Sequence, residues 1–269
     1  MSALHVVSVQ GYAGLQDGGR AGRAHEGIPP GGPLCRALAA RANAAVGNDD
    51  RAPVIELVGR IRLRAEGAVT VADHAGRPRE LPDGEEITFD APREFRAGYI
   101  SVAGAFDAPL LFGGRGALLA LGAAELPARA LSRGDRLAVG AGRAAAVSPA
   151  AALPDVDGPV RVIPGPDLGE LPAGALEALL AGDFIVGARS DRTGARLEGG
   201  RVPSRSAEAP SRPMVVGAIQ VPPDGAPIVL GPDGPTTGGY PVVAVLAAGA
   251  RDGFFGRPVG KPVKFTAGS

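Results

Sequence analysis

Residues 214–234 read MVVGAIQVPPDGAPIVLGPDG, two short apolar runs that are each followed by a Pro-Asp-Gly tripeptide. Proline presets the backbone for the start of a turn, and glycine accepts the torsion angles that close it. Apolar runs of this length between such turns are typical of short strands. The stretch therefore predicts strand, turn, strand and turn, and a third Pro-Asp-Gly at 82–84 repeats the signal in the first half of the chain.

The same alternation of apolar runs and turns extends along most of the 269 residues. It predicts six strands in each half of the chain: Leu4–Val9, Val54–Leu63, Ala68–Ala72, Glu86–Phe89, Tyr99–Val102, Leu137–Val139, Val160–Ile163, Asp183–Ala188, Met214–Val221, Pro227–Leu230, Pro241–Leu246 and Pro262–Phe265.

Two helices are predicted, the first starting at Pro33 and stopping at Gly47-Asn48, and the second over Pro172–Leu180. Two helices are too few for a fold that alternates strands with helices, so a mainly β fold with few short helices is expected. The segment Ala141–Pro159 has no clear period and is interpreted as a linker or a long surface loop. It divides the chain into two predicted β-barrel domains, 1–155 and 156–269, whose closure would remove exposed strand edges.

Composition narrows the classes of function. The 28 basic and 28 acidic residues give a net charge of +0 with no basic stripe, so no nucleic-acid partner is expected. No apolar run approaches the length of a membrane span, and the start of the chain lacks the pattern of a secretory signal, so a cytoplasmic location is expected. The single cysteine, Cys35, and the three histidines show no metal-ligand spacing, so no metal site is predicted.

Two polar clusters interrupt the strand pattern. Gln16–Gly22 places Asp17 and Arg20 three residues apart among glycines, and 190–199 contains Asp191, Arg192 and Arg196. A carboxylate and a guanidinium beside flexible backbone can recognise polar groups. Each cluster can equally be a charged turn held together by local contacts.

The third cluster combines residues 217–225 with 235–241. Two threonines, Thr236 and Thr237, precede Gly238 and Gly239, and they offer hydroxyls and backbone N–H groups to an anionic or carbonyl oxygen. The segment lacks the Gly-Lys-Ser/Thr ending of a phosphate-binding P-loop. A plain turn would explain the paired glycines but not the amide of Gln220, so this cluster favours a functional site.

Taken in order, these clusters resemble one family, which includes the C subunit of 5-oxoprolinase, allophanate hydrolase subunit 2 and the biotin-dependent carboxyltransferase subdomains A and B. The resemblance covers nearly the whole chain. It rests on the following segments: 16–22, Ala42-Asn43, 46–48, Glu56, 101–104, Phe106-Asp107, 190–199, 217–223 and 236–241.

The resemblance implies two linked cyclophilin-like β-barrels. It also implies a subunit of a bacterial ATP-dependent 5-oxoprolinase that is inactive alone and opens 5-oxoproline to glutamate with a B subunit (similar to allophanate hydrolase subunit 1) and an A-like subunit. The residues expected to act in catalysis are Asp17, Gln220, Thr236 and Thr237, and those expected to bind substrate are Arg20, Asp191, Arg192, Gly238, Gly239 and Tyr240. Within this set, Arg20 and Arg192 are the expected carboxylate ligands, and the two threonines are expected to face a carbonyl or phosphoryl oxygen.

The chain departs from the family pattern at several polar positions. Cys35 replaces an acidic residue, residues 114–117 keep only Arg115 of a Ser-Arg-Ser-Thr stretch, and Arg212 reverses a charge. Gly234 and Gly256 also stand where longer polar side chains are usual. These losses keep two alternatives open: a regulatory binding protein that antagonises a kinase inhibitor, or a carboxyltransferase component that would need biotin carried by another domain.

Overall fold

The computed structural model describes residues 2–122, 125, 127–141, 151–205 and 210–268. The chain forms two compact units. The first unit contains Met1–Arg20 and Gly31–Pro154, and the second contains Ala21–Pro30 and Asp155–Ser269. The short segment 21–30 thus falls outside the continuous division at 155 that the sequence suggests.

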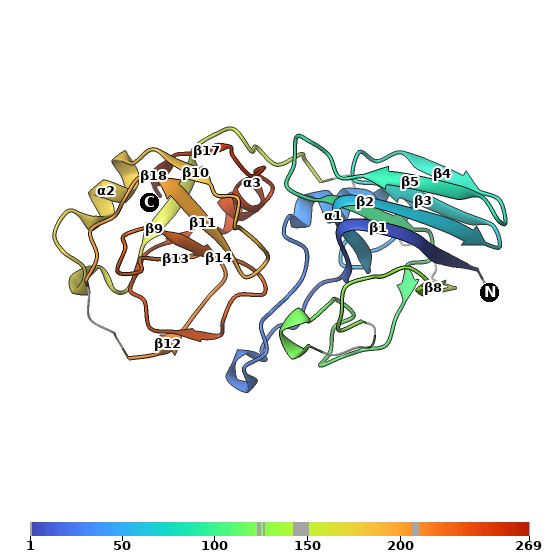
Figure 1. Cartoon of the computed structure of the whole chain (residues 1–269), viewed down its shortest axis with the longest axis horizontal. Coiled ribbons are helices and arrows are strands. Elements are labelled where there is room, and N and C mark those ends of the chain that lie inside the picture. The colour runs from blue at the N-terminus through green and yellow to red at the C-terminus, as the bar shows by residue number, and fades with distance from the viewer. Residues whose placement is uncertain (1, 123–124, 126, 142–150, 206–209, 269) are drawn as a thin grey trace. The chain divides into compact units, whose positions relative to one another are not determined.

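The first unit is an eight-stranded sheet with one α-helix (Figure 1). The strands follow the order β4-β3-β6-β2-β1-β8-β7, and β5 pairs with β2 beside β6. The bounds are β1 Ala3–Gln16, α1 Arg36–Ala45, β2 Val54–Glu66, β3 Val69–Asp73, β4 Pro78–Leu81, β5 Glu86–Asp90, β6 Gly98–Val102, β7 Phe106–Asp107, the 3-10 helix η2 Leu119–Leu121 and β8 Arg136–Val139.

The two longest strands of this sheet, β1 and β2, form an antiparallel pair that depends on two facing glycines. Gly11 lies opposite Gly59, with φ angles of 91° and 107°. A Cβ atom on Gly11 would lie 2.2 Å from the Val58 carbonyl oxygen, and one on Gly59 would lie 2.1 Å from the Gln10 carbonyl oxygen. Since no other residue fits this approach or this backbone conformation, the two glycines allow both strands to continue past their midpoints.

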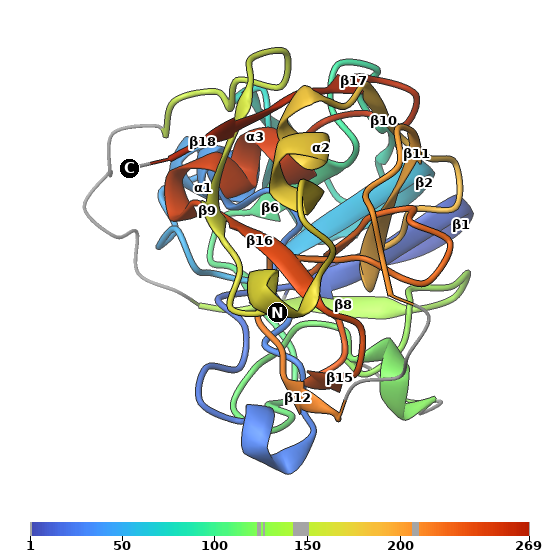
Figure 2. The ribbon, with the colours of Figure 1, turned by 90° about the vertical axis from the view of Figure 1, so that its left-hand side faces the viewer.

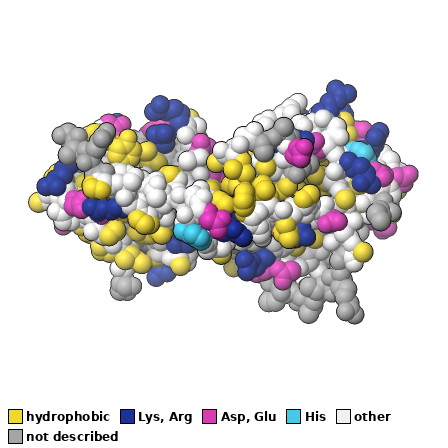
Figure 3. Space-filling view, turned by 90° about the horizontal axis from the view of Figure 1, so that it is seen from below, with side chains coloured by type: hydrophobic (Ala, Val, Ile, Leu, Met, Phe, Trp, Pro, Cys, Tyr) yellow, Lys and Arg dark blue, Asp and Glu magenta, His cyan; other side chains and the backbone are white. Residues whose placement is uncertain are grey.

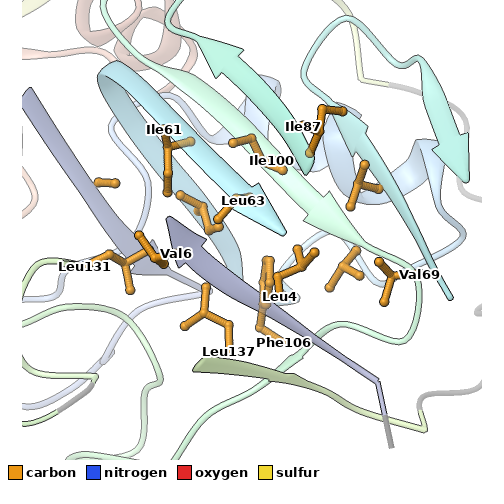
Figure 4. Packing of buried hydrophobic residues seen from close by; sticks show 14 of the residues in the cluster. Leu4, Val6, Ile61, Leu63, Val69, Ile87, Ile100, Phe106, Leu131 and Leu137 are labelled. Atoms are coloured by element: carbon orange, nitrogen blue, oxygen red, sulfur yellow. The ribbon is translucent and has the colours of Figure 1, made fainter. Parts of the chain in front are cut away.

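Apolar side chains from nearly all strands of the sheet meet in one core. Leu4 and Val6 of β1, Ile61 and Leu63 of β2, and Phe106 of β7 point toward one another (Figure 4). Each is at most 3% exposed. Burial of such side chains contributes about 1.5–3 kcal/mol each, so this cluster is the main source of stability in the first unit.

The second unit contains another eight-stranded sheet, with the order β17-β10-β11-β14-β13-β16-β9-β18, and a separate pair β12–β15 (Figure 2). The bounds are η1 Ala24–Glu26, β9 Val160–Pro164, η3 Leu168–Glu170, α2 Ala175–Ala181, β10 Phe184–Val186, β11 Gly194–Gly199, β12 Arg212–Pro213, β13 Ala218–Gln220, β14 Ile228–Leu230, β15 Thr237–Gly238, β16 Val242–Leu246, η4 Ala248–Ala250, α3 Arg251–Phe255, β17 Pro262–Val263 and β18 Phe265–Ala267.

The two edge strands of this second sheet are neighbours in the chain. Only Lys264 separates β17 from β18, so the chain itself joins one edge of the sheet to the other and curls it into a barrel. Phe265 then packs against Phe184 and Phe254, with ring centroids 5.9 and 6.4 Å apart. Closure therefore brings the ring of edge strand β18 against a ring of β10, near the other edge, and a ring of α3.

The mainly β fold, with three short α-helices in the described part of the chain, confirms the predicted fold class. Several details differ. Strands β4, β7, β12 and β15 and helix α3 were not predicted. Strand β11 lies where a polar site or a charged turn was expected, and the predicted strand Pro262–Phe265 is two strands. The predicted Met214–Val221 strand is shortened to β13, Ala218–Gln220. Gly217 has a φ of 88°, which interrupts the extended backbone, so the strand begins after it. Of the predicted linker Ala141–Pro159, residues 142–150 lie outside the described residues, and the rest contains no helix or strand.

None of the described helices is long and apolar enough to cross a bilayer. On the face shown in Figure 3, the described acidic and basic side chains are interspersed and form no large patch of one sign.

Three strands are tied together at the surface of the first unit by Glu66. Its carboxylate accepts hydrogen bonds from Arg136 Nε and Nη2, both at 2.8 Å, and lies 2.5 Å from His5 Nε2. Arg136 first and His5 second lower the pKa of Glu66 to about 2. Because the folded pKa lies below the unfolded value, the stability that this group contributes is present above the unfolded pKa and is lost as the pH falls through about 2.

We expect an NMR titration to place the midpoint of the Glu66 carboxyl near 2, and the Arg136→Gln variant to shift it upward, since the first-ranked donor is gone. Arg62→Gln is the matched control, because Arg62 pairs with a different carboxylate, Glu86. An Arg136→Gln midpoint equal to that of the parent would contradict this assignment.

Candidate functional site

In the first unit, Asp17 and Arg20 hold the loop 111–116. Asp17 accepts hydrogen bonds from the backbone N–H groups of Gly19 at 3.0 Å and Arg115 at 2.6 Å. Arg20 is 2% exposed and donates to the carbonyls of Leu111 at 2.8 Å and Gly116 at 2.6 Å. The geometry gives both residues a structural role in this loop, and their expected roles in catalysis and carboxylate binding stay predictions.

Gly116, one of the positions that departs from the family pattern, lies directly over this corner. A Cβ atom there would lie 2.9 Å from Gln16 Oε1 and 3.4 Å from Asp17 Oδ1. Gln16 is fully buried, so a side chain at 116 would have to displace the end of the Gln16 amide. Glycine at 116 fits this loop conformation without such a shift.

Glu56 and Tyr99, also in the first unit, support the start of α1. Glu56 Oε2 accepts the Leu34 N–H at 2.7 Å and the Tyr99 hydroxyl at 2.9 Å, and that hydroxyl accepts the Cys35 N–H at 2.9 Å. Burial, followed by the charge of Glu56, raises the pKa of Tyr99 well above its usual range. These contacts satisfy N–H groups that the helix itself leaves without acceptors, and Cys35 is buried beside them.

Three further buried polar residues of the family segments form a second internal network. Asn48 Nδ2 donates to Ser101 Oγ at 3.1 Å and to the Val102 carbonyl at 2.8 Å, and Ser101 Oγ donates to Asn43 Oδ1 at 2.5 Å. All three side chains are at most 8% exposed. The network joins the end of α1 to β6, and these hydrogen bonds give the three side chains a structural role within the first unit.

In the second unit, Arg192 forms a buried ion pair. Its Nε and Nη2 atoms donate to the two carboxylate oxygens of Asp233 at 2.7 and 2.8 Å, and both side chains are 8% exposed. Asp191 Oδ1 accepts the backbone N–H groups of Thr193 at 2.8 Å and Gly194 at 3.0 Å. Asp233 thus occupies the fork of Arg192 that was expected to bind a substrate carboxylate, and that expectation stays a prediction.

Gln220 and the glycines after the threonines are brought together in the same unit. Gln220 is 5% exposed, and its Nε2 donates to the Tyr240 carbonyl at 3.3 Å. A Cβ atom on Gly238 would lie 2.8 Å from Gln220 Nε2. The predicted association of Gln220 with Gly238 and Tyr240 is therefore present as direct packing.

Thr237 and Gly238 form strand β15, which pairs with β12. The Thr237 side chain is exposed, Thr236 and Gly239 are half-buried, and the Tyr240 side chain is 46% exposed. The Thr236 carbonyl accepts the Met214 N–H at 2.8 Å. The threonines thus lie on a two-stranded ribbon, where the Thr237 hydroxyl can reach a ligand from solvent.

Arg212, the position of reversed charge, ties this ribbon to the barrel. Its guanidinium donates to Asp167 and to Glu170, and Asp167 also accepts the Val242 N–H at 2.9 Å. Hydrogen bonding to Glu170 and the charge of Asp167 raise the pKa of Arg212. The reversed charge is therefore matched by two carboxylates of the same unit.

A cavity of about 530 Å³ opens on the second unit, bordered by Tyr240 and by the turn after Pro222. Its charged lining residues are Arg189, Arg196, Glu198, Arg201 and Asp224. Of the residues predicted for the site, only Tyr240 lines this cavity. Arg196 and Glu198 belong to a segment already singled out, but the interpretation of 190–199 as a turn concealed that they share one face of a strand.

The structure thus divides the predicted site residues between its units. Asp17 and Arg20 lie in the first, and the others, from Asp191 to Tyr240, lie in the second. Among the described residues, no group of three or more His, Cys, Asp or Glu side chains is placed to hold a metal ion.

The chain is similar to known proteins over nearly its whole length. It is 31% identical to the C subunit of 5-oxoprolinase from Escherichia coli (strain K12), over 97% of this chain and 90% of that protein. It is 24% identical to the C subunit of 5-oxoprolinase from Haemophilus influenzae, over 98% of this chain and 91% of that protein.

Two kinds of solved structure share the fold. The crystal structure of TTHA0988 matches with a TM-score of 0.85 and 29% identity, over 99% of this chain and 55% of that one. The urea carboxylase of Kluyveromyces lactis matches with a TM-score of 0.87 and 23% identity, over 99% of this chain and 27% of that one, and supports the fold alone. The chain therefore spans about half, or less, of these structures.

The family described as carboxyltransferase domain, subdomain A and B, matches residues 26–267, which covers the first unit from Gly31 onward and nearly all of the second. This match and the E. coli relative agree with the resemblance carried by the polar clusters. The chain belongs to the carboxyltransferase domain family, subdomains A and B.

Proposed function

We propose that this chain is the C subunit of an ATP-dependent 5-oxoprolinase and acts with B-like and A-like subunits to open 5-oxoproline to glutamate. The observation that carries the proposal is the match to two proteins that are each named as the C subunit of 5-oxoprolinase, over at least 97% of this chain and 90% of theirs. A match over this extent includes both units, so it is not limited to one shared module.

The chemistry explains why ATP is needed. A lactam carbonyl is a weak electrophile, because the ring nitrogen donates electron density to it. Transfer of the γ-phosphoryl group of ATP to the carbonyl oxygen turns that oxygen into a leaving group. Water then adds at the carbon, and the ring C–N bond breaks to give the free amine and an acyl phosphate. A second water displaces phosphate from this acyl phosphate and leaves the second carboxylate of glutamate. ATP is assigned to the complex, since this chain lacks the P-loop sequence.

The cavity beside Tyr240 gives the proposed subunit a place for a small polar substrate. A volume of about 530 Å³ lies within the range of about 300–1,000 Å³ that is usual for ligand sites. Its walls combine charged side chains with Pro222 and Pro223. A small ring that bears one carboxylate has complementary chemistry.

The test is ATP-dependent release of glutamate from 5-oxoproline by the co-expressed complex, with this chain present or omitted. We expect release only when this chain, its B-like and A-like partners and ATP are all present. Full activity without this chain, or none from a well-formed complex, would contradict the proposal.

Carboxyl transfer is a second candidate, because the family is named for that activity. It would require biotin carried by another protein. Transfer of a carboxyl group from carboxybiotin to urea by the same complex, without release of glutamate, would favour it.

A further inference from the structure

Strand β11 forms one wall of the cavity, and its side chains point alternately into the barrel and out of it. Ala195 and Leu197 are buried in the barrel, whereas Arg196 and Glu198 are exposed on the other face. Residues two apart on a strand lie about 7 Å from each other on the same face. The strand therefore presents a guanidinium and a carboxylate side by side to the cavity.

Gly187 leaves the space that the Glu198 carboxylate occupies. A Cβ atom on Gly187 would lie 2.5 Å from Glu198 Oε1, and the Gly187 N–H donates to the Arg196 carbonyl at 2.7 Å. Gly187 directly follows the neighbouring strand β10 and lies beside Arg196 and Glu198. The absence of a side chain at 187 leaves room for the Glu198 carboxylate in this position.

Two arginines of the cavity are unpaired within the described part of the chain. Neither Arg189 nor Arg196 forms an ion pair with a described residue, whereas Arg192 and Arg212 pair with carboxylates. The third cavity arginine, Arg201, donates to the Gly200 carbonyl at 3.0 Å. Exposed guanidinium groups that converge on a cavity are available to an outside anion.

The charged side chains that line the cavity favour an anion with a single negative charge. Three arginines and two carboxylates, Glu198 and Asp224, leave the cavity with one net positive charge. A phosphate dianion or a nucleotide would bring several negative charges close to both carboxylates. A molecule with a single carboxylate balances the lining, and Pro222 and Pro223 offer an apolar surface to its hydrocarbon part.

We propose that Arg189 and Arg196 form the carboxylate-binding subsite of this cavity, with Glu198 excluding polyanions. The identification of the bound molecule as 5-oxoproline rests on the proposed function; the subsite for a small monocarboxylate does not. Planar guanidinium groups bind a carboxylate through paired hydrogen bonds, which lysine cannot reproduce.

The binding test is calorimetric titration of the full chain, and of the assembled complex, with sodium 5-oxoproline. We expect Arg196→Gln and Arg189→Gln to weaken binding at least tenfold, and Arg196→Lys to restore only part of it. The matched control is Arg161→Gln, which removes an equally exposed charge from β9 of the same unit, away from the cavity. Unchanged melting temperatures establish that the variants are folded.

Each outcome decides the proposal. Equal loss in Arg161→Gln, no loss in the two cavity variants, or no saturable binding by either the chain or the complex would overturn the subsite. Tighter binding of inorganic phosphate than of 5-oxoproline would overturn the preference for a monocarboxylate, and Glu198→Gln is expected to strengthen phosphate binding.

The activity of the complex separates this proposal from the proposed function. Glutamate release with an unchanged KM for 5-oxoproline in Arg196→Gln would leave the function standing and the subsite wrong. Arginine-dependent binding of a monocarboxylate without glutamate release would leave the subsite standing and the oxoprolinase assignment wrong.

Discussion

Replacing Asp233 by asparagine is expected to lower the free energy of unfolding by about 3–5 kcal/mol, the usual cost of removing one partner of a buried ion pair. Asp233 holds the guanidinium of Arg192 with two hydrogen bonds, and both side chains are 8% exposed. Asparagine keeps one acceptor oxygen but leaves the buried cation without its counter-charge. Urea denaturation, read as a change in midpoint at constant slope, measures the loss.

The chain supplies a matched control for this change. Asp224 stands in the same Pro-Asp-Gly context, but it is exposed, and its one hydrogen bond within the described residues is from the Ala226 N–H, at 3.0 Å. We expect Asp224→Asn to cost less than about 1 kcal/mol. Equal losses from the two substitutions would show that the turn, and not the ion pair, is the source of the effect.

A double substitution separates the attraction between the two charges from the cost of removing those charges from water. Arg192→Met combined with Asp233→Leu removes both charges, and apolar residues of similar volume often replace a buried pair at little cost. The double variant is therefore expected to be more stable than Asp233→Asn. If the double variant were instead less stable than Asp233→Asn, the two side chains would stabilise the fold by more than the attraction between their charges.

The ion pair also shows what the sequence could and could not predict about the site. Arg192 was recognisable as a functional candidate from its neighbours, but Asp233 lies 41 residues away in a segment chosen for its turn signal. Pairing of β11 with β14 brings the two together, and that register depends on the folded sheet. Local sequence patterns indicate a charged residue; they do not reveal which partner it meets.

The fold was predicted where local chemistry dominates. The Pro-Asp-Gly turns and the apolar runs between them indicated the mainly β class, and both predicted helices are present as α1 and α2. Strand β11 was missed because its outer face carries Arg196 and Glu198, which gave it the composition of a turn. Helix α3 was missed because it is five residues long and contains Gly253.

The length of β1 was underestimated for a related reason. The predicted strand stopped at Val9, whereas β1 continues to Gln16 through Gly11. Glycine is usually unfavourable within a strand, but here the Gly11–Gly59 pairing allows the two backbones to approach closely. Such a pairing joins residues from distant segments, so it could not be read from either one alone.

The substitution Glu56→Ala is expected to lower the free energy of unfolding by about 3–4 kcal/mol. The carboxylate is fully buried and accepts the Leu34 N–H and the Tyr99 hydroxyl. Its loss leaves these buried donors without their acceptor, at about 1–3 kcal/mol each, and opens a cavity beneath the start of α1. Urea denaturation measures the total loss. The increase in amide hydrogen exchange relative to the parent is expected to be largest in the first turn of α1.

Two further variants make the cause identifiable. Glu56→Gln keeps an acceptor oxygen without the charge, so an intermediate loss is expected, and the difference from alanine reports on hydrogen bonding. Glu86→Ala removes an exposed glutamate of β5 that pairs with Arg62 at the surface, at 3.6 Å, and it is expected to cost less than about 1 kcal/mol. If Glu56→Ala cost no more than Glu86→Ala, the carboxylate would not be the support of α1. If exchange accelerated evenly across the first unit and not at α1, Glu56 would stabilise the sheet of that unit as a whole instead of the start of the helix.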